Sequence, residues 1–512
     1  MRRRSLAVLF LAWSSLSLWA QAPPPAPPKL VLAIVVDQCR YDYMTRFRAD
    51  FTGGLKRLLD QGAVFTNANY QASPTVTAVG HSTFLTGAMP AKSGIIGNQW
   101  WDRTEGKAVT SVSDDKTRLL GGRDSSGSSP ERLLVSTVGD ELKTSGKGGK
   151  VIGISLKDRS AILPAGHKAN GAYWFDGLTG NMVSSTYYFP ELPAWVREFN
   201  ATRPIDKYAG QEWLGHKMPA AAGPGLYASV DATPFSDELL QAFALRALVA
   251  ENMGTGSKTD VLAVSYSGVD YVGHRDGPDS PEIHDMVQRV DKLIGALIDA
   301  AEARAGRGSV LVAFTADHGS TPVPEENQKR KMPGGRIVWN ACRAAAEKAL
   351  NDRFGAGQWI SFSADGVIYL RPDPIPGKKL DMSEVQKVAA DALRAQPHIA
   401  RVYTKAQLAA GLPGTDPVDV RVRNGFNAAR GPDIFTVTEP YYLFSATGTG
   451  HGSPYEYDTH VPVIFLDPGS RIQPGNYAGP VGVEDIAPTL ATLLAIEPPS
   501  GNMGRVLIEM LK

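Results

Sequence analysis

The feature that most constrains the fold is a set of short, strongly apolar runs that end in acidic or imidazole side chains. The two clearest runs read VLAVSYS and VLVAFT, and they are followed by Asp270 with His274 and by Asp317 with His318. Runs of this length and β-branched content predict buried strands. Because ligands bind at the carboxyl ends of strands in open α/β sheets, we expect both pairs at one edge. One such pair alone would be typical of a solvated loop, but two predict a metal site, since carboxylate and imidazole are usual zinc ligands.

Further apolar runs extend the predicted sheet and bring more polar residues to its edge. Residues 30–36 are followed by Asp37, and residues 151–156 are followed by Lys157 and Arg159. Another run, VPVIFL, comes ten residues after His451. Continuous apolar runs are typical of parallel strands covered on both faces. The pattern therefore predicts an α/β fold with a mostly parallel sheet.

The segments between the strands contain helical and turn signals. We expect helical spacing over 40–59, a helix over 129–142 with Ser129 as its N-cap, and an amphipathic helix opening at Ser280. Residues 172–183 are aromatic and glycine-rich and predict a hairpin that departs from the sheet. A last helix is expected from Asp485 to Leu494.

The amino-terminal residues 1–22 have the pattern of a secretory signal peptide, with three arginines followed by an apolar run. Cleavage is predicted after Ala20 or Ala22, and residues 23–29 form a proline-rich tether. The apolar run is short for a membrane span, so we expect no stable membrane insertion, with an uncleaved anchor as the alternative. These signals favour a periplasmic or secreted protein.

The composition excludes several classes of protein. With 43% hydrophobic and 21% charged residues, the chain is typical of a folded protein. Its formal net charge of +1 gives no electrostatic basis for binding nucleic acid. The two cysteines, Cys39 and Cys342, are too few for a disulfide framework.

The 512 residues suffice for a large domain with an insertion. Residues 323–445 are punctuated by proline and glycine, and the core-like pattern returns after them. We therefore predict a catalytic domain built from 30–322 and 446–512, interrupted by an inserted cap over 323–445.

Taken in order, these residues resemble the alkaline phosphatase superfamily, and most of all its secreted zinc phosphomonoesterases with a threonine nucleophile. The resemblance covers nearly the whole mature chain and is carried by VVDQ at Asp37, SPTVTAVGH at Thr77, GIIGN at Asn98, SLKDR at Lys157 and Arg159, SGVDYVGH at Asp270 and His274, ADHG at Asp317 and His318, and GHGS at His451. It implies a central mixed, mostly parallel sheet with helices on both faces and an inserted cap.

The resemblance also implies the site. Two zinc ions are expected, one held by Asp270, His274 and His451, the other by Asp37, Asp317 and His318. Thr77 would be the nucleophile and a zinc ligand, because zinc lowers the pKa of a bound oxygen. There are two competing interpretations. Thr77 would be a helix N-cap, which is compatible with catalysis, or Thr75 would be the nucleophile instead.

Asn98, Lys157 and Arg159 are expected to bind the substrate phosphate, with the Lys-x-Arg pair on one face of an extended segment. His81 is expected to be a supporting or packing residue. The substrates would be small phosphate esters, and the sequence specifies neither the physiological substrate nor the oligomeric state.

The main alternative is a phosphodiesterase or nucleotide pyrophosphatase on the same metals, with Tyr173, Trp174 and Phe175 as a platform for a base. The related diesterase branch lacks the Lys-x-Arg pair, so Lys157 and Arg159 favour monoesters. A sulfatase is disfavoured because no Cys/Ser-x-Pro-x-Arg motif occurs at the nucleophile. A catalytically inactive phosphate- or metal-binding protein is disfavoured because every ligand and the nucleophile are present.

Overall fold

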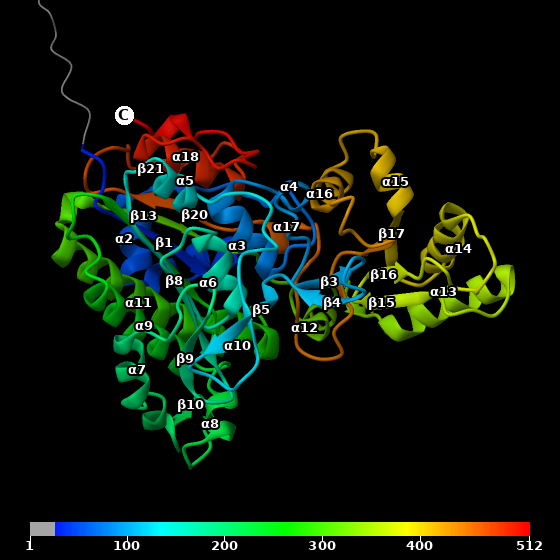
Figure 1. Ribbon diagram of the computed structural model, residues 1–512, viewed down its shortest axis with the longest axis horizontal. Coiled ribbons are helices and arrows are strands. Elements are labelled where there is room, and N and C mark those ends of the chain that lie inside the picture. Colours follow the sequence, from blue (N-terminus) through cyan, green and yellow to red (C-terminus); the bar gives the residue numbers. More distant parts are fainter. Residues whose placement is uncertain (1–25) are drawn as a thin grey trace, which may run out of the picture.

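A computed structural model describes residues 26–512, so the predicted signal peptide and the first three residues of the tether lie outside the described residues. One large sheet runs through the main body of the molecule (Figure 1). Its 11 strands are ordered β21 (Gly475–Tyr477), β2 (Ala63–Phe65), β20 (Val463–Leu466), β13 (Val310–Thr315), β1 (Leu30–Val36), β12 (Thr259–Tyr266), β7 (Gly148–Ser155), β8 (Gly171–Asp176), β9 (Asn181–Ser185), β5 (Ser113–Leu120) and β6 (Ser126–Ser128).

The centre of this sheet is parallel, as predicted. Strands β13, β1, β12, β7 and β8 run in the same direction, and every residue of β1, β12 and β13 is buried. The register pairs Val36 with Tyr266 and Val35 with Thr315. These three strands therefore end side by side, and the residues that follow them start from one edge.

Helices cover both faces of the sheet (Figure 1). On one side α3 (Thr77–Thr86), α5 (Val138–Thr144), α6 (Asp158–Ala165) and α18 (Ile486–Leu494) contact one another. On the other, α11 (Pro281–Ala305) contacts α2 (Gly54–Gln61), α9 (Pro234–Ala250) and α10 (Gly268–Asp276). The predicted helix at Ser280 is confirmed, with the Ser280 hydroxyl accepting from Ile283 N at 3.2 Å. Between residues 26 and 512, none of the helices combines the length and apolarity needed to cross a bilayer.

Residues after β13 build a smaller unit that projects from the main body at the right of Figure 1. Its four-stranded antiparallel sheet is ordered β15 (Ile360–Ala364), β16 (Val367–Leu370), β18 (Ile434–Thr438) and β17 (Ile399–Thr404). Helices α13 (Trp339–Phe354) and α14 (Met382–Arg394) pack on it with their own apolar core, and α15 (Lys405–Ala410) and α16 (Pro417–Gly425) follow. We call this unit the insertion; its boundaries at 323 and 445 stay predictions.

One helix prediction and one hairpin prediction were wrong in detail. The helix expected over 129–142 begins only at Val138, because Thr137 forms a capping box with Asp140 while the Ser129 hydroxyl donates to Asp114 Oδ2 at 2.7 Å. The hairpin expected from 172 is present as β8 and β9, but it belongs to the main sheet. Cys39 and Cys342 are buried and not joined to each other.

The helical spacing over 40–59 is also interrupted, giving α1 (Tyr41–Arg46) and α2 in place of one helix. A Cβ at Gly53 would lie 2.5 Å from the Asp291 carbonyl oxygen, so the chain approaches α11 closely there. The buried Asp291 carboxylate accepts from the amides of Gly53 and Leu55 at 2.6 and 2.7 Å, and so fixes the start of α2.

Candidate active site

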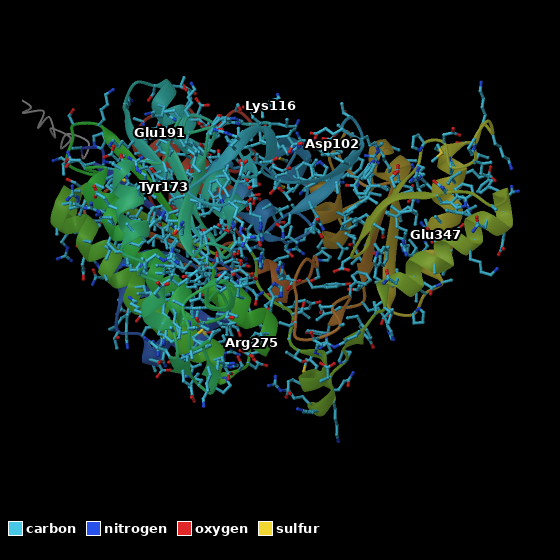
Figure 2. The ribbon with its side chains drawn as sticks, turned by 60° about the horizontal axis from the view of Figure 1, so that its bottom comes forward. Asp102, Lys116, Tyr173, Glu191, Arg275 and Glu347 are labelled. Carbon is cyan, nitrogen blue, oxygen red and sulfur yellow. The ribbon has the colours of Figure 1, made fainter. Side chains whose placement is uncertain are left out.

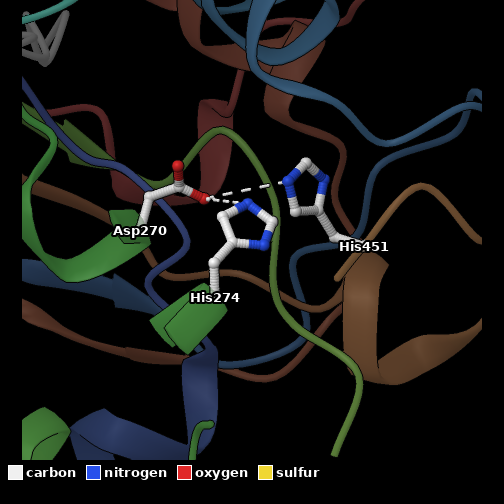
Figure 3. Close-up of side chains that lie close together, drawn as sticks. All are labelled: Asp270, His274 and His451. Carbon is white, nitrogen blue, oxygen red and sulfur yellow. Dashed lines mark ion pairs between the residues drawn. The ribbon is translucent and has the colours of Figure 1, made fainter. Parts of the chain in front are cut away.

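The first cluster of metal-ligating side chains comprises Asp270, His274 and His451 (Figure 3). Asp270 and His274 lie one turn apart on α10, and this spacing places both on one helix face. Their atoms His274 Nε2 and Asp270 Oδ1 are 3.2 Å apart, and His451 Nε2 lies 3.7 Å from the same oxygen. The Nδ1 atoms of the two histidines hydrogen-bond to the Thr449 and Thr75 carbonyl oxygens, at 2.9 and 2.8 Å. Each Nε2 is therefore turned toward the shared carboxylate, the arrangement typical of metal-binding histidines.

The second cluster comprises Asp37, Asp317 and His318, all of them fully buried. His318 Nε2 lies 3.5 Å from Asp37 Oδ1 and 3.4 Å from Asp317 Oδ2. Within residues 26–512, none of these three atoms has a hydrogen-bond partner. Buried polar atoms are normally paired, so three unpaired ligand atoms that converge on one point fit a cation. A set of carboxylates and imidazoles without cysteine suits a metal ion in a catalytic site.

The two clusters are in direct contact. The rings of His318 and His451 are stacked, with centroids 3.5 Å apart and an interplanar angle of 14°. Lys157 joins the clusters as well, because its Nζ lies 2.6 Å from Asp37 Oδ2 and 2.5 Å from Asp270 Oδ2. The structure thus brings together all six residues that the sequence grouped as ligands, and it adds a lysine between them.

Burial governs the protonation of the carboxylates. It raises the pKa of Asp37 to about 7, and the nearby Asp270 and Asp317 carboxylates act in the same direction. Burial also opposes ionisation of Asp270, but the Lys157 ammonium, together with His274 and His451, outweighs it and holds the Asp270 pKa well below its usual range. The crowded negative charge of this site is therefore compensated by a cation, here the Lys157 ammonium.

Burial and the Asp270 charge also set the pKa values of the three histidines. Burial lowers the pKa of His318 to about 4 and that of His451 well below its ordinary value, so both are neutral near pH 7. Burial acts in the same direction on His274, but the Asp270 carboxylate raises its pKa to about 9. Neutral imidazoles are the form that binds metals.

Thr77 is at the start of α3, a helix whose beginning lies close to both clusters through Gly80 and the Thr75 carbonyl oxygen. It is the first helical residue, with Val76 as the N-cap, so the N-cap interpretation of Thr77 was wrong by one position. A Cβ at Gly80 would lie 2.2 Å from the Asp317 carbonyl oxygen, so the first turn of α3 rests directly on the second cluster. His81, in the next position, brings Nδ1 to 3.2 Å from Asp317 Oδ2 and Nε2 to 2.7 Å from Ser265 Oγ. This helix therefore presents its amino terminus, with its positive dipole end, to the site.

Asn98 contacts the first turn of α3, and Arg159 lies on α6. Asn98 Oδ1 accepts from Ala78 N in the first turn of α3 at 2.8 Å, which leaves its NH₂ group to donate elsewhere. Arg159 is partly exposed, and its Nε is buried without a partner. The expectation of an extended Lys-x-Arg segment was wrong, because Lys157 is the N-cap of α6 and Arg159 lies within that helix. Burial and the nearby Arg159 charge both lower the pKa of Lys157. The Asp270 and Asp37 carboxylates outweigh them, so the pKa of Lys157 is raised on balance.

Sequence reasoning missed Gln38. Its backbone N–H donates to Asp317 Oδ1 at 3.0 Å, and its Nε2 donates to Asp270 Oδ1 at 2.7 Å. The side chain is fully buried and the backbone adopts a φ of 63°. Its position directly after Asp37 was the available signal, but nothing in the sequence indicates that a side chain there contacts Asp270.

The aromatic platform proposed for a base is contradicted. Tyr173, Trp174 and Phe175 are all buried, and the Tyr173 ring packs against Phe189 and Trp195. Figure 2 shows Tyr173 in the main body, far from Glu347 on the insertion. These side chains are core residues and are not available to a ligand.

Comparisons with known proteins show which family this chain resembles. Residues 31–461 match the family described as type I phosphodiesterase / nucleotide pyrophosphatase. The chain is 36% identical to alkaline phosphatase PhoV of Synechococcus elongatus over 99% of this chain and 98% of that protein. It is 35% identical to alkaline phosphatase PafA of Elizabethkingia meningoseptica over 96% of each.

The similarity extends to solved structures. The crystal structure of wild-type PafA superposes with a TM-score of 0.88, covering 95% of this chain and 99% of that chain at 33% identity. A second crystal structure, with a TM-score of 0.86 and 32% identity over 95% and 99% of the two chains, is of a PafA mutant. In that mutant one threonine is replaced by serine, and one asparagine, one lysine and one arginine are replaced by alanine.

Proposed function

We propose that this chain, which belongs to the type I phosphodiesterase / nucleotide pyrophosphatase family within the alkaline phosphatase superfamily, hydrolyses phosphate monoesters. The observation that carries the proposal is the pair of ligand clusters joined by the stacked rings of His318 and His451, with Thr77 at a helix start beside them. Near full-length similarity to two alkaline phosphatases supports the choice of reaction.

The metal-binding residues fit two divalent cations, and we infer that these are zinc. Asp270, His274 and His451 would hold one, and Asp37, Asp317 and His318 the other. Two such ions supply Lewis acidity at the attacking and leaving oxygens of an in-line displacement. Thr77 would contribute its oxygen to the second cluster, against which α3 rests.

Thr77 is the proposed nucleophile. Its Oγ forms a bond to phosphorus as the ester P–O bond breaks, and the alcohol leaves with a proton. Water then cleaves the phosphothreonine, which releases inorganic phosphate and restores the hydroxyl. The amino terminus of α3 favours the negative phosphoryl group through its dipole and free amides.

Asn98, Lys157 and Arg159 are the proposed phosphate ligands. The Asn98 NH₂ is left to donate, and Lys157 and Arg159 supply positive charge to a dianion. Cations in both clusters would repel the Lys157 ammonium from Asp37 and Asp270 and free it for the phosphate. The PafA mutant alters the same four residue types in the same order, with the same interval from threonine to asparagine as between Thr77 and Asn98.

The decisive experiment compares hydrolysis of an aryl phosphate and of its methyl diester by zinc-loaded protein. A monoesterase will have the larger kcat/KM for the aryl phosphate. A strong preference for the diester would establish the alternative, a phosphodiesterase or nucleotide pyrophosphatase, which the family description keeps open. Phosphate binding without any turnover would instead indicate an inactive binding protein.

We also propose export to the periplasm or the medium, on the basis of the signal-peptide pattern over 1–22. Cell fractionation combined with amino-terminal sequencing of the mature protein tests this. A mature chain that begins near residue 21 or 23 supports cleavage, and a retained Met1 in the membrane fraction contradicts it.

A further inference from the structure

A cavity of about 490 Å³ lies between the insertion and the carboxyl ends of the central strands. The main body lines one side of it with Val76, Asn98, His274 and His451. The insertion lines the other side with residues of β16, β18 and the segment after β19 (Tyr442–Leu443). Its volume is in the range of sites that hold an organic ligand.

The cavity adjoins only one of the two ligand clusters. His274 and His451 of the first cluster line it, whereas Asp37, Asp317 and His318 of the second do not. Because the first turn of α3 rests on the second cluster, a phosphate bound at Asn98 and attacked by Thr77 would direct its ester group toward the first cluster and into the cavity. An in-line displacement requires this, because the leaving oxygen lies opposite the nucleophile.

The far wall of the cavity is apolar and aromatic. The insertion contributes Phe426, Phe435 and Phe444, which are only partly buried, together with Leu408 and Val367. Partly buried rings at a cavity surface are suited to packing against another flat ring, by stacking or edge contact. Such contacts would favour an aryl group over a small polar alcohol.

The charged residues of the cavity lining also favour an uncharged leaving group. Within the described part of the chain, the lining residues include Asp365 and Asp458 but no lysine and no arginine. Asp458 is fully buried and hydrogen-bonded to Ser453 and Thr321, but Asp365 is exposed, so a second anionic group on the substrate would meet this carboxylate and no cation of the lining. Nucleoside polyphosphates and sugar bisphosphates are thus poorly matched to this wall.

We propose that the insertion forms a leaving-group site selecting phosphate monoesters of uncharged aromatic alcohols over those carrying a second negative charge. This rests on the proposed monoesterase function, which it deepens by naming the substrate class. The residues that determine it are Phe435 of β18 and the aromatic side chains around it.

The test uses non-hydrolysable phosphonates, so that binding is measured independently of turnover. Zinc-loaded protein is titrated with methylphosphonate, benzylphosphonate and 4-carboxybenzylphosphonate by calorimetry. We expect benzylphosphonate to bind about tenfold more tightly than methylphosphonate, and the carboxylate to remove most of that gain. Equal affinities for all three would overturn the leaving-group site, whereas failure of every monoester to turn over would count against the proposed function alone.

Two variants sharpen the result. Phe435→Ala is expected to lower benzylphosphonate affinity about fivefold to tenfold while methylphosphonate affinity changes less than about twofold, and Phe435→Leu should restore part of the loss.

Gln99 lines the cavity, is exposed and is not part of the phosphate site, so Gln99→Lys can be made without disturbing the core. Gln99→Lys should strengthen binding of 4-carboxybenzylphosphonate relative to benzylphosphonate. Parallel losses for methyl- and benzylphosphonate in Phe435→Ala, together with no change of preference in Gln99→Lys, would refute the proposal.

Discussion

Gln38 donates its side-chain N–H to Asp270 Oδ1 at 2.7 Å, across 232 residues of sequence. The backbone N–H of Gln38 holds Asp317 at the same time, so a single residue contacts one carboxylate from each ligand cluster. A Cβ at Gly273 would lie 2.0 Å from Gln38 Oε1, which explains why α10 has a glycine where it passes this side chain. Gln38 thus fixes the two clusters relative to each other.

Replacing Gln38 with leucine should therefore weaken metal binding. Groups that orient metal ligands are typically worth 10–100-fold in metal affinity, and we expect a loss of about that size. Zinc affinity is measured by competition with a chromogenic chelator, so the result does not depend on activity. Gln211→Leu, at an exposed glutamine, is the matched control. Unchanged zinc affinity in Gln38→Leu would mean that the hydrogen bonds do not position the ligands.

Thr77→Ala should abolish turnover, because it removes the proposed nucleophile. Zinc content measured by atomic spectroscopy should stay near that of the wild type, since the six carboxylate and imidazole ligands remain. Thr75→Ala is the matched control and tests the competing nucleophile: its hydroxyl donates to the Ser453 carbonyl oxygen at 2.9 Å and should be needed only for local stability. Loss of turnover in Thr75→Ala with activity retained in Thr77→Ala would reverse the assignment.

Arg159→Ala should reduce monoester hydrolysis far more than diester hydrolysis. A monoester dianion offers one more charged oxygen than a diester, so it loses more when a guanidinium is removed; we expect roughly 10²-fold in kcat/KM, from a charge-assisted contact of about 2–3 kcal/mol. The two esters are assayed side by side in the variant and in Arg123→Ala, which changes an exposed arginine. Equal losses for both esters would show that Arg159 does not discriminate between them.

The parts of the site that could be predicted are those that follow from strands. Asp37 and Asp317 come within two residues of the ends of parallel strands whose register aligns them, so their proximity follows from the sheet. His274 follows from Asp270 by helical spacing. Contacts made by loops and side chains could not be predicted in this way, as the position of Lys157 between two carboxylates illustrates.

The fold errors have a similar origin. Ser129 followed by proline is a good helix start locally, yet its hydroxyl pairs with Asp114, and the helix begins at Val138 with Thr137 as its N-cap. Tyr173 looked available to a ligand because its neighbours are glycine-rich, but a strand between β7 and β9 is covered on both faces. In each case tertiary contacts overrode a local signal.

Removing divalent cations should lower the melting temperature, because Asp37 Oδ1, Asp317 Oδ2 and His318 Nε2 have no hydrogen-bond partner among the described residues. A cation at about a thousand times its Kd would add about 4 kcal/mol to the free energy of unfolding. Scanning calorimetry with zinc and with a chelator measures the shift. In His318→Ala the shift should shrink, whereas in His167→Ala, away from the clusters, it should persist. A shift of equal size in both variants would place the stabilising ion elsewhere.

Glu484→Gln should make the protein less sensitive to alkaline pH. Burial raises the pKa of Glu484 from 4.5 to about 8, and in the part of the chain that the structure describes its Oε2 has no hydrogen-bond partner. The folded state therefore holds the proton more tightly than the unfolded state does. Its contribution to stability is complete below pH 4.5 and is lost as the pH rises to about 8, at up to about 1.4 kcal/mol per pH unit.

Urea unfolding at pH 5 and pH 9 measures this difference. The glutamine variant cannot ionise, so its free energy of unfolding should fall less between the two pH values than that of the wild type. Glu191→Gln is the control, because the Glu191 side chain is 85% exposed and charge there meets little desolvation. If the wild type and Glu484→Gln lose the same stability between pH 5 and pH 9, then Glu484 is already ionised in the folded protein, and an unrecognised partner must compensate its charge.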